Sequence, residues 1–93
     1  MVNYIKETIN NVLRIERVYD LAGRVVVIGT VVSGKISQGM TSTARDKRFV
    51  VERIEVKGAP IDYLLQDETG DLIIYGRGLE KDDFRKGQIQ YFE

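Results

Sequence analysis

The amino-acid sequence predicts an all-β fold, a small closed or nearly closed barrel of six or seven strands. Residues 25–32 are β-branched with one exception, Gly29, which favours a long, buried strand. Further short segments alternate apolar and polar residues and are separated by glycine-containing turns. A chain of 93 residues has room for one compact core only. We therefore expect a single barrel domain.

The first eleven residues are expected to form an arm outside the barrel. Their apolar side chains recur at helical spacing, but Asn10 and Asn11 disfavour a helix interior. The arm is therefore assigned no definite conformation, and the barrel is placed at residues 12–93.

The first half of the barrel is expected to centre on residues 23–39. Residues 12–19 alternate as a half-buried strand, and residues 20–23 turn the chain into the β-branched strand. The sequence Ser-Gly-Lys at 33–35 then predicts a tight turn, after which Ile36 begins a returning strand. This pattern predicts a central hairpin.

The second half reads as further short strands. Residues 41–48 indicate a short strand and an exposed loop, and residues 49–56 alternate as a strand with one wet face. After a turn at 57–60 the pattern resumes at 61–65, 72–75 and 88–92, the last being the closing strand. Residues 80–87 are highly charged and predict a surface turn with Phe84 as its apolar anchor.

Composition limits the function. Fourteen basic and fourteen acidic residues give zero net charge, so a nucleic-acid site would have to be a local patch. Histidine and cysteine are absent, which removes Ser-His-Asp and Cys-His catalysis and thiolate metal sites. We expect no enzyme, no cofactor and no metal site. The lack of a membrane span, a secretory signal and cysteine indicates a cytoplasmic protein.

Two motifs that imitate functional sites have simpler interpretations. Residues 29–35 match the G-x-x-x-x-G-K part of a phosphate loop, but Ile36 replaces the Mg²⁺-ligating hydroxyl and Gly39 arrives before a helix could form. No nucleotide binding is therefore expected. The acids Glu80, Asp82 and Asp83 lie among lysines and arginines, which indicates local charge balance at a turn.

One group of basic residues is the predicted RNA-binding surface. It consists of Lys35, Arg45, Lys47, Arg48, Arg53 and Lys57. The alternative interpretation is a solvated loop and a wet strand face. Exposed tyrosines could stack on bases, but tyrosines in short strands more often fill the core.

The order of several segments resembles the β-barrel second domain of translational GTPases, such as elongation factor Tu. The resemblance covers most of the chain after the first ten or so residues. It is carried by residues 13–19, 23–24, 29–36 with Gly39, 51–56, 70–71 and 77–89. Glycines expected to be structural are Gly23, Gly29, Gly34, Gly39, Gly70, Gly78 and Gly87.

This resemblance implies a barrel of the translation-protein type, here without a GTP-hydrolysing domain. It places Glu16 and Tyr19 where an acidic residue and a phenylalanine of the family meet the aminoacyl end of tRNA, while Arg17 stands where the family has an acid. The expected function is a non-catalytic module that binds RNA or a ribonucleoprotein such as the ribosome. The alternative is a protein-interaction or homo-oligomerisation module that uses a strand edge. No membrane contact is expected.

Overall fold

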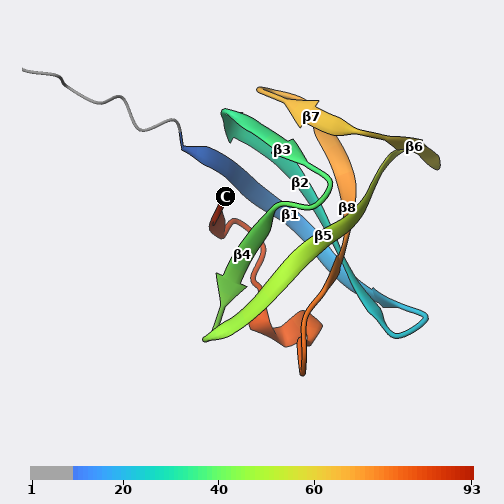
Figure 1. Ribbon diagram of the computed structural model, residues 1–93, viewed down its shortest axis with the longest axis vertical. Helices are drawn as coiled ribbons and strands as arrows, with labels where there is room; N and C mark the ends of the chain where they lie inside the picture. The colour runs from blue at the N-terminus through green and yellow to red at the C-terminus, as the bar shows by residue number, and fades with distance from the viewer. Residues whose placement is uncertain (1–9) are drawn as a thin grey trace, which may run out of the picture.

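The computed structural model describes residues 10–93 (Figure 1). The predicted arm lies almost wholly outside the described residues, and the first strand begins at Asn11. The described strands are β1 (Asn11–Leu21), β2 (Arg24–Ser33), β3 (Lys35–Ser37), β4 (Thr41–Ala44), β5 (Lys47–Val56), β6 (Ala59–Ile61), β7 (Tyr63–Leu65), β8 (Thr69–Tyr75) and β9 (Ile89–Phe92). A single-turn 3-10 helix, η1 (Lys81–Asp83), precedes β9. No helix among residues 10–93 is both long and apolar enough to cross a membrane.

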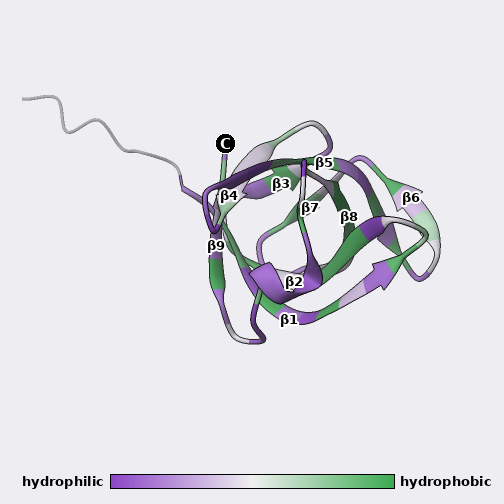
Figure 2. Ribbon diagram, turned by 90° about the horizontal axis from the view of Figure 1, so that it is seen from below, coloured by the Kyte–Doolittle hydropathy of each residue, from purple (hydrophilic) through white to green (hydrophobic). Residues whose placement is uncertain are grey.

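Six strands form a nearly closed antiparallel barrel, as the sequence predicts. Their order is β4-β5-β8-β2-β1-β9, and Figure 2 shows them curving around a central core. The two outermost strands meet at one end, where Thr41 and Glu93 exchange backbone hydrogen bonds of 2.7 and 2.9 Å. Beyond that point β4 and β9 are not joined by backbone pairing. The barrel therefore has one incomplete seam.

The central hairpin predicted at residues 23–39 is wrong in its second half. β3 pairs with β7, whereas the neighbours of β2 are β1 and β8. The chain leaves β2 at Gly34, which has φ +74° and lies so close to Asn11 that a Cβ would be 2.5 Å from its side-chain oxygen. Both edges of β2 are already occupied, so β3 must find another partner. The true hairpin joins β1 to β2 through Ala22 and Gly23, both with positive φ.

Three register shifts interrupt the strand pairing, and the one between Val12 and Leu13 leaves Val32 as an extra residue in β2. Glu16 is the extra residue in β1, and Glu52 is the extra residue in β5. Val51 and Ile54, three residues apart, consequently both face the core. The clean alternation predicted for residues 49–56 is therefore wrong, because a single inserted residue moves the following side chains to the other face.

The core fills the barrel with aliphatic side chains. Its largest fully buried members are Leu13, Ile15, Ile36, Ile54, Leu64, Leu72, Ile74, Val26, Val31 and Val51. Gly29 and Gly70 face each other on β2 and β8, where Cβ atoms would lie 2.6 Å from Leu13 and 3.0 Å from Leu64. Their missing side chains make room for these two leucines. The other predicted structural glycines, Gly23, Gly34, Gly39, Gly78 and Gly87, all have positive φ.

Candidate functional site

Three of the predicted basic residues lie together at one end of the barrel. Arg45 is in the two-residue turn between β4 and β5, and Lys47 and Arg48 begin β5. Arg45 and Arg48 are exposed, and Arg48 donates from Nη2 to the Thr41 hydroxyl at 3.0 Å. Lys47 is less available to a ligand than these two arginines, because its ammonium contacts both carboxylate oxygens of Asp83 at 2.9 and 3.2 Å.

The other three predicted basic residues lie elsewhere. Lys57 is in the turn at the opposite end of β5, and Lys35 is on β3 with its ammonium 5.2 Å from the Tyr63 ring centroid. Arg53 pairs with Glu55 at 2.7 Å. The structure therefore does not gather the six residues into one surface.

Asp83 holds the charged loop at residues 80–87 against the barrel. Its carboxylate accepts a hydrogen bond of 2.8 Å from the Glu80 amide and pairs with Lys47, and the side chain is 5% exposed. These two interactions, the backbone hydrogen bond first, lower the pKa of Asp83 below its ordinary value. Phe84 follows and packs edge-on against Phe49, with ring centroids 5.5 Å apart. The prediction of a surface turn anchored by Phe84 agrees with this arrangement.

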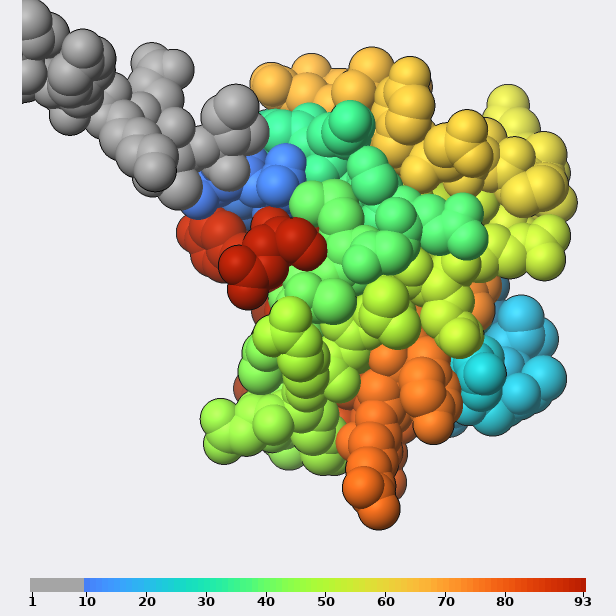
Figure 3. Space-filling model, in the orientation of Figure 1, coloured from blue at the N-terminus to red at the C-terminus, as the bar shows by residue number. Residues whose placement is uncertain are grey.

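Sequence reasoning missed further basic residues that the fold brings to the same end. Gly76 lies against Arg48 and Phe49, so the loop at 77–78 sits beside the start of β5. The contacts of Asp83 and Phe84 bring residues 80–86 there as well. We call residues 45–48 and 77–86 the basic end (bottom of Figure 3). Its basic residues are Arg45, Lys47, Arg48, Arg77, Lys81, Arg85 and Lys86, against four acids.

The opposite end has the reverse charge. Residues 52–71, which include β6, β7 and the turns around them, carry two basic and six acidic side chains. We call this segment the acidic end, and it forms the upper and right-hand parts of Figure 3. The chain, although neutral as a whole, thus has two ends of opposite charge. The useful signal was the four basic residues at 77–86, three of which lie in the segment 80–87 that the sequence predicts to be a charge-balanced surface turn.

Glu16 and Tyr19, the residues matched to the aminoacyl pocket of the resembled family, lie on β1. Glu16 is the bulged residue, and its Oε1 accepts hydrogen bonds from Arg14 at 3.0 Å and from Thr30 at 3.3 Å. Tyr19 lies three residues further, opposite Val26. Glu16 is therefore engaged in contacts within the barrel wall.

Three of the strand tyrosines are more exposed than the sequence predicts. Tyr63, Tyr75 and Tyr91 are 47%, 47% and 61% exposed. Each lies on a strand position that points away from the core. The expectation that tyrosines fill the core is wrong for these three, because aliphatic residues and phenylalanines already fill the small barrel.

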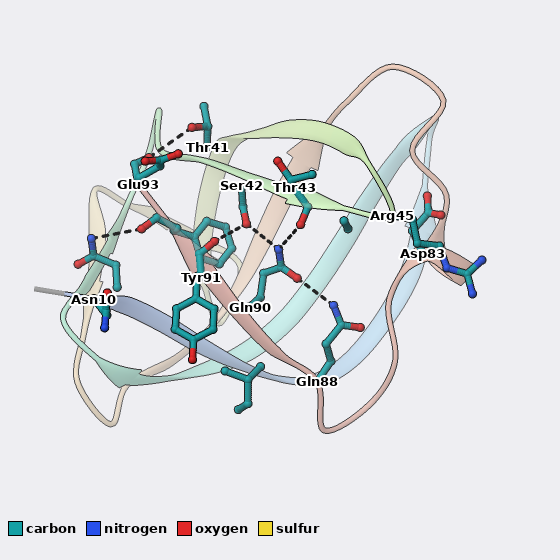
Figure 4. Close-up of a pocket in the computed structure, with 14 residues that line it drawn as sticks. Asn10, Thr41, Ser42, Thr43, Arg45, Asp83, Gln88, Gln90, Tyr91 and Glu93 are labelled. Atoms are coloured by element: carbon teal, nitrogen blue, oxygen red, sulfur yellow. Dashed lines mark hydrogen bonds between the residues drawn. The ribbon is translucent and has the colours of Figure 1, made fainter. Parts of the chain in front are cut away.

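The incomplete seam between β4 and β9 forms an open groove with a volume of about 810 Å³. We call it the β4–β9 groove. It is lined by Asn10, Asn11, Thr41, Ser42, Thr43, Ala44, Arg45, Asp83, Gln88, Ile89, Gln90, Tyr91, Phe92 and Glu93. Figure 4 shows Gln90 at its centre, with Nε2 donating to the Ser42 hydroxyl at 2.6 Å and to the Thr43 carbonyl at 2.8 Å. The Ser42 hydroxyl in turn donates to the Tyr91 carbonyl. Side chains, rather than backbone pairing, therefore bridge the seam.

Comparison with known proteins identifies no relative. The sequence matches no family model and no curated protein. Among residues 10–93, no group of three or more acidic side chains is placed to hold a metal ion.

Proposed function

We propose that this chain is a non-catalytic binding module that contacts RNA, or a ribonucleoprotein such as the ribosome, through the basic end. The observation that carries the proposal is the separation of charge, with a net charge of +3 at the basic end and −4 at the acidic end. RNA binding draws most of its affinity from phosphate neutralisation by lysine and arginine. A local surplus of this kind offers phosphates a binding surface even though the whole chain is neutral.

The basic end also keeps its arginines accessible. Four ion pairs are present among the described residues, and of the seven basic residues at this end only Lys47 takes part in one. Arg45, Arg48, Arg77 and Arg85 are exposed. Arginine presents a planar fork of donors that matches phosphate oxygens. Because the loops that carry these side chains are anchored by Asp83 and Phe84, little ordering should be needed when RNA binds.

The resemblance to the second domain of translational GTPases supports the same function. In that family the barrel contacts tRNA or the small ribosomal subunit, and the hydrolytic machinery lies in another domain. A barrel of this kind would act in the cytoplasm as a binding module. The proposed contact surface, however, is the basic end rather than Glu16 and Tyr19.

The test compares two triple variants that remove the same number of positive charges. Arg48, Arg77 and Arg85 are replaced by alanine in one, and Lys35, Arg53 and Lys57 in the other. Binding to a single-stranded RNA 20-mer is measured by fluorescence anisotropy across a salt series. We expect the first variant to lose roughly tenfold or more in affinity at low salt and to show a shallower salt dependence. The second should lose much less.

Equal losses in the two triple variants would contradict the proposal, because binding would then follow total charge rather than the basic end. Absence of RNA binding by the unsubstituted chain at low salt would also contradict it. Co-sedimentation with ribosomes at low and moderate salt, using the same two variants, distinguishes a ribonucleoprotein target from bare RNA.

A further inference from the structure

The β4–β9 groove separates two strand edges that pair at one end only. Thr41 and Glu93 join them by two backbone hydrogen bonds, and toward Arg45 and Gln88 the strands diverge (Figure 4). Between these points only side chains span the seam. Among residues 10–93, the edges of β4 and β9 that face the groove therefore have no strand paired with them beyond Thr41 and Glu93.

The alternation of an antiparallel ladder shows which backbone groups face the groove. The N–H and C=O groups of Thr41 and Glu93 point across the seam, so those of Thr43 and Tyr91, two residues away, point there too. The carbonyls of Thr43 and Tyr91 are satisfied by Gln90 and Ser42. Within residues 10–93, no hydrogen bond joins the two facing amides to a partner across the seam. Gln90 and Ser42 thus bridge a gap of one side chain between the two strands, and a strand added there would have to displace both side chains.

The walls and ends of the groove define what would fit. The side chains of Ile89 and Tyr91 project from β9. They are 45% and 61% exposed, although one is aliphatic and the other aromatic. Arg45 lies at the open end and Glu93 at the joined end. The one carboxylate near Arg45 in the groove lining, Asp83, is already neutralised by Lys47.

We propose that the β4–β9 groove binds an extended peptide segment of a partner protein, which adds as a strand and places an acidic residue beside Arg45. The segment's backbone would pair with the amides of Thr43 and Tyr91, and alternate apolar side chains would cover Ile89 and Tyr91. Strand addition of this kind takes its affinity from main-chain hydrogen bonds and its specificity from side chains at alternate positions.

A second copy of the chain fits the groove less well. Every strand among residues 10–93 is already paired within its own barrel, so a folded copy offers no unpaired strand for insertion. RNA fits less well too, because the groove is lined mainly by uncharged side chains and an exposed carboxylate at Glu93. The variant that tests RNA binding changes Arg48, Arg77 and Arg85, which lie outside this lining, whereas Arg45 and Asp83 belong to both the groove and the basic end.

The experiment selects ligands for the full 93-residue chain from a phage-displayed library of random nonapeptides. We expect enrichment of peptides with alternating apolar residues and an acidic residue at one end. Synthetic copies of these peptides should slow hydrogen exchange at the amides of Thr43 and Tyr91. Tyr91→Lys should weaken peptide binding at least tenfold, because a charge on a strand edge opposes pairing, whereas the matched variant Tyr63→Lys should not.

Reversing the charge of Arg45 tests where the acidic residue of the peptide lies, without altering the core of the barrel. Selection against Arg45→Glu should enrich basic instead of acidic end residues. Tyr91→Lys should not weaken RNA binding, so that failure of this proposal and failure of the RNA proposal are distinguishable. Lack of enrichment, peptides that protect other amides, or a dimer dissociated by Tyr91→Lys would each overturn the peptide assignment. If RNA displaces the selected peptides and protects the same amides from hydrogen exchange, the groove would be assigned to RNA.

Discussion

The two ends of the barrel use the same kind of turn but differ in how the turn is supported. At the basic end, Arg45 and Asp46 both adopt positive φ without a glycine, at 49° and 64°. At the acidic end, Lys57 and Gly58 form the corresponding turn, with glycine at the second position. The basic end is reinforced by the Asp83–Lys47 pair and by Phe49 and Phe84.

This difference shows that the turn with two non-glycine residues at positive φ lies beside the more firmly anchored loop. A residue other than glycine in the left-handed region costs about 1 kcal/mol or more. The packing of η1 and Phe84 against the start of β5 can offset that cost. The positively charged side chains are thereby presented from an anchored surface, which suits the proposed RNA contact.

The largest expected difference between the ends is the loss of stability when a glycine is replaced by alanine, at Gly76 beside the basic end and at Gly58 in the acidic end. A Cβ on Gly76 would lie 2.5 Å from the Arg48 carbonyl oxygen and 2.9 Å from the Phe49 Cβ, whereas a Cβ on Gly58 would meet nothing within 4 Å. Gly76→Ala should therefore destabilise the fold by roughly 2–3 kcal/mol through overpacking. Gly58→Ala should cost about 1 kcal/mol through its positive φ alone. Urea unfolding of both variants measures this, and a larger loss for Gly58→Ala would contradict the proposed packing.

A smaller effect is expected from Asp83, and it should depend on pH. Because folding lowers the pKa of Asp83, its contribution is fully present above the ordinary aspartate pKa of 3.8 and is lost as pH falls through the lower folded value. Asp83→Asn should lower the melting temperature at pH 7 and reduce the loss of stability on acidification below about pH 4. Thermal melts between pH 2 and 7 test this, with Asp62→Asn at the acidic end as the control. An identical acid dependence in Asp83→Asn and the parent chain would contradict the assigned role.

The smallest expected effect comes from exchanging the residues at the second turn position, Asp46 at the basic end and Gly58 at the acidic end. Asp46→Gly should relieve the positive φ at the second turn position and stabilise the fold by about 0.5–1 kcal/mol. Gly58→Asp should destabilise it by a similar amount. Both turns are exposed, so denaturant midpoints report the backbone effect directly. A destabilised Asp46→Gly variant would show that the Asp46 side chain makes a contribution greater than its backbone strain.

Much of the fold followed from local pattern. The strands at 25–32 and 88–92 and the anchoring role of Phe84 are readable from β-branched runs, alternation and an isolated apolar residue among charges. The sequence did not indicate which strand pairs with β3. The pattern around Ile36 predicts a strand, but it does not show which other strand has an unoccupied edge. The bulges at Glu16 and Glu52 were also missed, since an extra glutamate looks like an ordinary wet-face residue.

The candidate site was only partly predictable for a related reason. Arg45, Lys47 and Arg48 are adjacent in sequence and stay together in space. Arg77 and Arg85 join them only through the long-range contacts of Gly76, Asp83 and Phe84. Lys57 looked close to Arg48 along the chain, but β5 is an extended strand of 10 residues that carries it to the opposite end.

The most direct test of the central claim is a residue-level map of RNA contact. An isotope-labelled chain would be titrated with a single-stranded RNA 20-mer at low salt, and the amide chemical shifts would be followed by NMR. We predict that the changes concentrate at residues 45–48 and 77–86 and leave residues 57–68 nearly unaffected. Changes centred on residues 57–68, or spread evenly over both ends, would contradict the assignment of RNA binding to the basic end.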